Sequence, residues 1–126
     1  MTRTTNDLIN ELDNAVTDQD TLCGTTQTAL VVGFNLECKM IFHDESDKLQ
    51  KLNTMVQDGG IPLGFIKVVK VGNDFEFLSK PLTGFEKNEK IQRILTEVCT
   101  IIGKTETFRD AGGSSSPIAV GSVRYD

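Results

Sequence analysis

Hydrophobic residues recur with the period of an α-helix in three segments of the chain. These segments are residues 6–16, residues 44–57 and a segment from about residue 86 to residue 102. In each one, apolar residues three and four positions apart form a single stripe, which is the pattern of an amphipathic helix. The third segment shows the period most clearly, through Ile91, Ile94, Leu95, Val98, Ile101 and Ile102. The pattern therefore predicts three helices.

Residues at the ends of these segments agree with that prediction. Thr4 and Asp7 stand three positions apart at the start of the first segment, an arrangement that resembles a capping box. Gly59 and Gly60 follow the second segment and Gly103 follows the third, where glycine commonly ends a helix. Acidic residues around the first turn of the second segment complement the helix dipole.

Between the first two helices, the hydrophobic pattern changes to that of strands. It predicts strands at residues 29–34 and 36–42, and the second strand alternates between two faces. Because only Asn35 and its neighbours separate the two runs, a tight hairpin is expected. One long bent strand is the alternative interpretation.

A second pair of strands is predicted between the second and third helices. Residues 63–71 are strongly apolar, and the sequence Gly72-Asn73 then marks a turn. Phe75 and Phe77 alternate on the strand that follows, and Pro81 ends it. These signals predict another hairpin.

The last part of the chain, residues 104–126, has the composition of a tail. Residues 111–117 are rich in glycine and serine, which is typical of a flexible segment. Apolar residues return at Ile118, Val120 and Val123. Residues 118–125 therefore form a possible final edge strand, and this strand is a candidate for donation to a partner subunit.

Together these elements predict an α+β fold with a mainly antiparallel sheet and three helices. The order is α-β-β-α-β-β-α with a possible C-terminal edge strand, and the helices cover one or both faces of the sheet. No repeat or boundary divides the chain, so residues 1–126 are expected to form a single domain.

Composition and charge then narrow the range of partners. The chain has 126 residues and a formal net charge of −5. An acidic chain repels a phosphate backbone at long range, which argues against DNA or RNA as a partner. The longest apolar runs are too short for a transmembrane helix, so no membrane partner is expected.

The cysteines indicate the compartment. Cys23, Cys38 and Cys99 are far apart, and the chain has no CxxC motif, so the sequence does not support a zinc ribbon or a redox dithiol. Thiols in apolar patterns suit a reducing cytoplasm. The first residues lack the apolar core of a signal peptide. A cytoplasmic location is therefore expected.

One cluster, residues 43–47, has residue types that are used in catalysis or metal binding. His43 is the only histidine and stands beside three acids, yet an acidic helix start explains the same pattern. The chain has no G-x-S-x-G motif, no P-loop and no Rossmann fingerprint. We therefore expect no cofactor, no metal and no enzymatic activity. A small hydrolase built on His43 and Asp44 is the catalytic alternative.

Two late arginines are the stronger candidates for a binding site. Arg109 and Arg124 flank a Gly-Gly-Ser-Ser-Ser stretch, whose backbone amides and hydroxyls can join an arginine fork around phosphate oxygens. Phe108 lies beside one of these arginines, and Phe85 opens the third helix; both are candidates to stack on a base. A solvated tail with two ordinary surface arginines is the alternative.

In length, in its helices beside a small sheet, and in the pair Arg109 and Arg124, the chain resembles phage-encoded Thoeris anti-defence sponge proteins of the first type. The resemblance implies a non-enzymatic homo-oligomer in the host bacterial cytoplasm that sequesters a cyclic ADP-ribose signal at a protomer interface. Arginines would grip the phosphates, and Phe85 would be the stacking aromatic.

The element order is also similar to that of roadblock and profilin-like modules, which dimerise through a helix and a sheet edge. Here the third helix comes one strand early, and the extra strand follows it. This second resemblance implies a protein–protein interaction module as the alternative function.

Overall fold

The computed structural model describes residues 4–15, 28–34, 37–43, 45–71, 74–102 and 118–124. For residues 15, 68–71, 74–75, 102 and 118–124 it describes the backbone alone. The elements in chain order are α1 (Thr5–Ala15), β1 (Thr28–Phe34), β2 (Glu37–Phe42), α3 (Lys48–Gln57), β3 (Ile61–Val71), β4 (Asp74–Pro81), α4 (Glu89–Ile102) and β5 (Ile118–Arg124).

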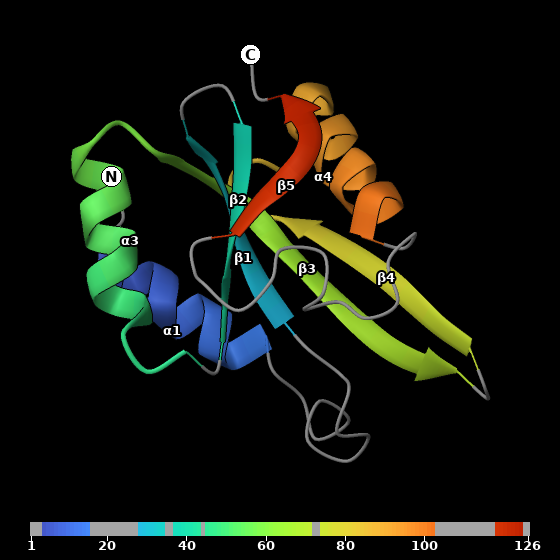
Figure 1. The fold of residues 1–126 in the computed structure, drawn as a ribbon, viewed down its shortest axis with the longest axis horizontal. Coiled ribbons are helices and arrows are strands. Elements are labelled where there is room, and N and C mark those ends of the chain that lie inside the picture. Colours follow the sequence, from blue (N-terminus) through green and yellow to red (C-terminus); the bar gives the residue numbers. More distant parts are fainter. Residues whose placement is uncertain are drawn as a thin grey trace.

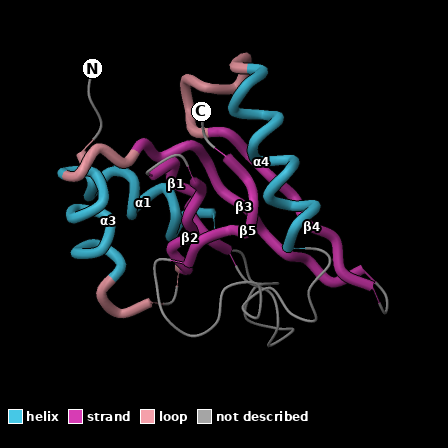
Figure 2. Tube along the Cα trace, turned by 45° about the horizontal axis from the view of Figure 1, so that its top comes forward, coloured by secondary structure: helices cyan, strands magenta, loops and turns pink. Residues whose placement is uncertain are grey.

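The strands form one five-stranded sheet in the order β4-β3-β1-β2-β5. Every neighbouring pair in it is antiparallel. Helices α1 and α3 lie on one face and α4 lies on the other (Figures 1 and 2). This arrangement confirms the predicted α+β class and element order. The pairing of β1 with β2 also confirms the first hairpin and rules out the single bent strand.

The sheet separates two hydrophobic clusters, one beneath each helical layer. The cluster on the α4 face includes Val31 and Met40 from the sheet and Leu95 from the helix. The cluster on the α1 and α3 face includes Leu12 from α1 and Leu52 from α3. Alternate residues of the central strand β1 contribute to the two clusters, because successive side chains of a strand point to opposite faces.

The predicted helix ends are confirmed at α1 and at the C-terminus of α3. Thr4 and Asp7 form a reciprocal capping box, in which each backbone N–H donates to the other side chain over 3.1 Å. Gly59 has φ of 98°, and the Gly60 N–H donates to the Met55 carbonyl oxygen over 2.7 Å. This is a Schellman motif, and it requires a residue that tolerates positive φ.

Two helices begin later than the pattern predicts. Helix α3 begins at Lys48 rather than residue 44, because the Glu45 side chain accepts a hydrogen bond from the Phe42 N–H over 3.2 Å. Helix α4 begins at Glu89 rather than about residue 86, because the Asn88 side chain accepts a hydrogen bond from the Ile91 N–H over 3.1 Å. In both cases a local hydrogen bond holds the preceding residues outside the helix.

Polar contacts connect α1 to α3. The Lys48 ammonium is paired with the Asp13 carboxylate, and the Thr5 hydroxyl is hydrogen-bonded to the Asn53 side chain. The two contacts lie near opposite ends of α1, so they orient this helix relative to α3. Among the described helices, none has the length and apolar character needed to cross a membrane.

The predicted C-terminal edge strand is present. Strand β5 pairs with β2 of the same chain and forms one edge of the sheet. The rest of the predicted tail, residues 104–117 and 125–126, lies outside the described residues. Donation of this strand to a partner subunit stays a prediction.

Candidate functional site

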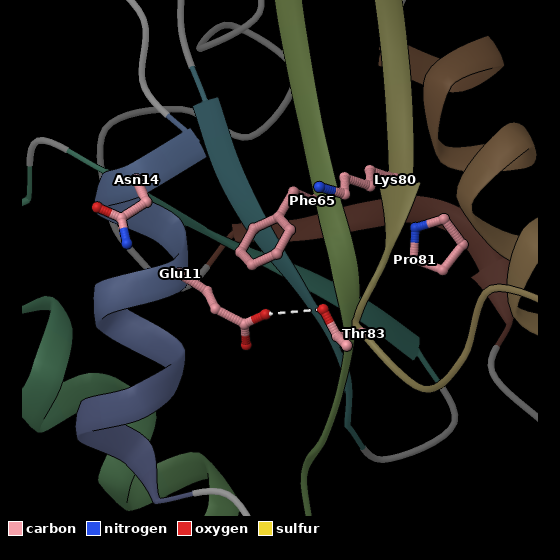
Figure 3. A pocket seen from close by; sticks show the side chains of 6 residues that line it. All are labelled: Glu11, Asn14, Phe65, Lys80, Pro81 and Thr83. Atoms are coloured by element: carbon pink, nitrogen blue, oxygen red, sulfur yellow. Dashed lines mark hydrogen bonds between the residues drawn. The ribbon is translucent and has the colours of Figure 1, made fainter.

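A hollow with both polar and apolar lining residues lies between α1 and the strands β3 and β4 (Figure 3). Its volume is about 170 Å³. Its lining combines a carboxylate, an amide, an ammonium, a hydroxyl, an aromatic ring and a proline ring, supplied by Glu11, Asn14, Lys80, Thr83, Phe65 and Pro81.

Helix α1 supplies one wall of this hollow. Leu8 and Leu12 are buried and hold the helix on the sheet. Glu11 and Asn14 stand three positions apart, so they are neighbours along the helix surface, on the flank of the buried stripe. Figure 3 shows the Glu11 side chain extending from α1 toward β3 and β4, with Asn14 at the upper end of the helix.

Strand pairing supplies the opposite wall and the floor. Lys80 of β4 is the register partner of Phe65 in β3. Partners in an antiparallel ladder project from the same face of the sheet, so both lie on the α1 side. The Phe65 side chain is buried and belongs to the cluster beneath α1. Its ring forms the floor of the hollow.

A tight turn after β4 completes the lining. The Leu82 N–H donates to the Leu63 carbonyl oxygen over 3.1 Å, and the Phe85 N–H donates to the Leu82 carbonyl oxygen over 2.8 Å. Gly84 has φ of 102°, which favours glycine in this turn. The turn brings Thr83 beside α1, where its hydroxyl lies 3.4 Å from the Glu11 Oε1.

The hollow therefore contains two opposite charges on facing elements. The Glu11 carboxylate comes from α1 and the Lys80 ammonium comes from β4, while the ring of Phe65 lies at the bottom (Figure 3). Charge-assisted hydrogen bonds are stronger than neutral ones, so such a pair can orient a ligand that carries both charges.

The lining offers opposite charges, hydrogen-bonding groups and an aromatic ring. None of the six lining residues is a histidine or a cysteine. Within the described part of the chain, no group of three or more histidine, cysteine or acidic residues is placed to hold a metal ion. The arrangement can recognise charge and shape.

Two thiols lie away from the hollow, in the cluster on the α4 face. Burial raises the pKa of Cys38 to about 11, with a further contribution from the negative charge of Glu97. Burial also raises the pKa of Cys99 to about 11, and a hydrogen bond with the Ser79 side chain opposes part of this increase. At neutral pH both thiols are protonated and poorly nucleophilic.

The structure places only part of the predicted nucleotide site. Arg124 ends β5, and its backbone stands in register with Glu37 of β2. Phe85 is half-buried and packs against both hydrophobic clusters, so it helps to close the core. Phe108 and Arg109 lie outside the described residues. The predicted meeting of Arg109 and Arg124 around an anion therefore stays a prediction.

The backbone of His43 has a structural role. Its N–H donates to the Thr28 carbonyl oxygen over 2.9 Å. Its carbonyl oxygen accepts a hydrogen bond from the Lys48 ammonium over 2.7 Å. Asp44 lies outside the described residues. These contacts fit the interpretation of this segment as a strand end before a helix.

Sequence reasoning missed the hollow. Glu11 and Asn14 were recognisable as polar residues on the flank of the first apolar stripe. The sequence alone does not show that this side of the helix lies near Lys80. The register of β3 with β4 and the position of α1 on the sheet are tertiary features.

Comparison of the chain with protein-family models, curated proteins and solved structures finds no match in any of the three. The resemblances to Thoeris sponge proteins and to roadblock modules therefore stay predictions.

Proposed function

We propose that this chain is a binding protein for a small zwitterionic molecule of amino-acid size, which it holds without converting it. The observation that carries this proposal is the placement of the Glu11 carboxylate and the Lys80 ammonium on facing elements of the hollow above Phe65 (Figure 3).

Each part of such a ligand has a counterpart in the lining. A ligand ammonium pairs with Glu11, and a ligand carboxylate pairs with Lys80. An apolar side chain packs on the Phe65 ring. The amide of Asn14 can both donate and accept, so it fits either polar group.

The volume limits the size of the ligand. Pockets for drug-sized ligands measure roughly 300–1,000 Å³, whereas this hollow measures about 170 Å³. A nucleotide is too large for it, and a single amino acid is closer in size.

Sequestration of a phosphate-bearing nucleotide is the second candidate function, at a different site. It is favoured by the fact that residues 118–124 form a strand, which gives the Arg124 backbone a defined position at the sheet edge. Homo-oligomerisation belongs to this hypothesis, because the site is expected at a protomer interface.

A cytoplasmic location is part of both proposals and is supported by the free thiols of Cys38 and Cys99.

Isothermal titration with three related probes tests the pocket. L-Leucine carries both charges, 3-methylbutylamine carries only the ammonium, and 4-methylpentanoate carries only the carboxylate. We expect Glu11→Gln to weaken the binding of leucine and of the amine at least tenfold. Lys80→Gln should weaken the binding of leucine and of the carboxylate to the same degree.

Charge-matched controls are available on the opposite face of the sheet. Arg93→Gln and Glu97→Gln remove the same charges from exposed positions of α4. These variants should bind leucine as the parent does. If the parent gives no heat with millimolar leucine, or if the two pocket variants bind it as tightly as the parent does, this function is wrong.

A further inference from the structure

Strand β4 is the outermost strand on one side of the sheet, next to β3 (Figure 1). At its centre Leu78 has 50 % of its surface exposed, more than any other large hydrophobic residue whose side chain the structure describes. An edge strand with an apolar centre is a template for pairing with another strand, and natural proteins commonly protect such edges with charged residues or proline.

The direction of the backbone groups along β4 follows from one hydrogen bond. The Leu82 N–H donates to the Leu63 carbonyl oxygen over 3.1 Å, so Leu82 points its backbone groups toward β3. This direction alternates from residue to residue along a strand. The backbone groups of Lys80 and Leu78 therefore also point toward β3, whereas the backbone groups of Ser79 point outward. Pro81 occupies an outward position, so the missing N–H limits pairing at that end.

Two side chains on the same face as Leu78 carry opposite charges at equal distances from it. Glu76 and Lys80 stand two residues before and two residues after it, and both are exposed. The register of β4 on β3 places all three on the α1 side of the sheet. Reading outward from Leu78, the strand therefore presents an acid on one side and a base at the same distance on the other.

We propose that two copies of this chain pair through β4, antiparallel, with the two-fold axis at Leu78. Leu78 then lies opposite Leu78 of the second copy, and each Glu76 lies opposite Lys80 of the other copy. The interface is isologous, as in most two-fold dimers, and the two sheets join into one. The proposal does not rest on the pocket function, although Lys80 belongs to both sites and pairs with Glu76 of the second copy in the dimer.

The backbone geometry favours the same register. The backbone groups of Leu78 point toward β3, so Leu78 and its symmetry mate form a non-hydrogen-bonded pair. Side chains are closest at such pairs, where the Cα atoms are about 4.5 Å apart. Glu76 and Lys80 of the other copy also form a non-hydrogen-bonded pair. The short separation at such a pair strengthens the attraction between their opposite charges.

Other registers lack this complementarity. A shift of two residues in either direction places a charged residue, Glu76 or Lys80, opposite Leu78. A shift of four residues in either direction places like charges opposite each other, which is destabilising. Lys80 therefore lies opposite Glu76, with Leu78 opposite Leu78, only in the register centred on Leu78.

Charge reversal tests the proposal with the full chain, by sedimentation-equilibrium measurements of the dimer dissociation constant. We expect Glu76→Lys to raise that constant at least tenfold, and Lys80→Glu to do the same. The double variant E76K/K80E restores the pattern and should dimerise as the parent does. Glu97→Lys on α4 makes the same change of charge away from the edge and should have no effect.

Cysteine substitution tests the register. Leu78→Cys places two thiols at a Cα separation that a disulfide accepts, so mild oxidation should produce a covalent dimer that the parent does not form. Glu76→Cys is the matched control, because its counterpart across the axis is Lys80, and it should not cross-link.

Three results would overturn the proposal. They are a parent that is monomeric at high micromolar concentration, a dimer that Glu76→Lys and Lys80→Glu leave intact, and equal cross-linking by the two cysteine variants. The double variant E76K/K80E separates this proposal from the pocket function, because it retains the dimer while it removes the pocket ammonium. Circular dichroism checks that every variant is folded.

Discussion

Leu95 of α4 packs directly over Gly64 of β3. A Cβ on Gly64 would lie 2.9 Å from the Leu95 Cδ1 and 2.4 Å from the Lys80 carbonyl oxygen. The absence of a side chain at Gly64 therefore lets α4 approach the sheet and lets β4 pair closely with β3 at the strand end that carries the hollow.

The first prediction concerns this close approach. Gly64→Ala should lower the free energy of unfolding by about 1–3 kcal/mol, the usual range for overpacking a core. Thermal unfolding followed by circular dichroism measures the effect. Gly59→Ala is the comparison, because no atom lies within 4 Å of its added Cβ and only the positive φ opposes it. An unchanged melting temperature in Gly64→Ala would contradict the close packing of Leu95 and of the Lys80 carbonyl on Gly64.

The second prediction concerns the capping box at the start of α1. Thr4→Ala removes the side-chain acceptor of the Asp7 N–H and should cost about 1 kcal/mol of stability. Thr54→Ala is the control, because the Thr54 hydroxyl donates to the Gln50 carbonyl oxygen within α3 and caps no helix end. Urea unfolding should separate the two variants. If Thr4→Ala and Thr54→Ala unfold at the same urea concentration, the capping box does not contribute to the stability of the fold.

The third prediction concerns the buried thiols. Burial raises the pKa of Cys38 and of Cys99 to about 11, above an ordinary value of 9.0. Between these values the unfolded chain releases thiol protons that the folded chain retains. The free energy of unfolding should therefore fall as the pH rises from about 9 to 11, with the full contribution present below pH 9.

Denaturant unfolding at a series of pH values measures this slope. Cys38→Ala and Cys99→Ala should each flatten it, and the double variant should flatten it most. In the folded parent at pH 8, both thiols should react slowly with a disulfide reagent and rapidly after unfolding. Fast reaction of both thiols in the folded protein is the contrary outcome.

The fourth prediction concerns the late arginines. If the chain sequesters a nucleotide of the cyclic ADP-ribose type, Arg109→Ala and Arg124→Ala should each weaken binding at least tenfold, about 1.4 kcal/mol. Arg93→Ala on the exposed face of α4 is the matched control. A thermal-shift panel with ADP-ribose nucleotides gives the first measurement, because a bound ligand raises the melting temperature. If the double variant with both Arg109 and Arg124 replaced binds the nucleotide as tightly as the parent does, the assignment of these arginines to the site is wrong.

The local elements of the fold follow from the sequence. The apolar stripes predicted the three helices, the alternation predicted the two hairpins, and the apolar residues after the glycine-rich stretch predicted β5. Thr4, Asp7 and the Gly59-Gly60 pair marked helix ends that the structure confirms. These features are local, since backbone geometry and the burial of one face impose them within a few residues.

Tertiary structure alone decided the order of the strands, the division of the helices between the two faces, and the hollow beside α1. Lys80 meets Phe65 because β4 pairs with β3 in one register, and Glu11 faces them because α1 packs on that side of the sheet. The later starts of α3 and α4 also came from side-chain hydrogen bonds of Glu45 and Asn88 that periodicity does not report. A hydrophobic pattern specifies which face of each element is buried, whereas the partner that covers it depends on packing between residues far apart in the chain.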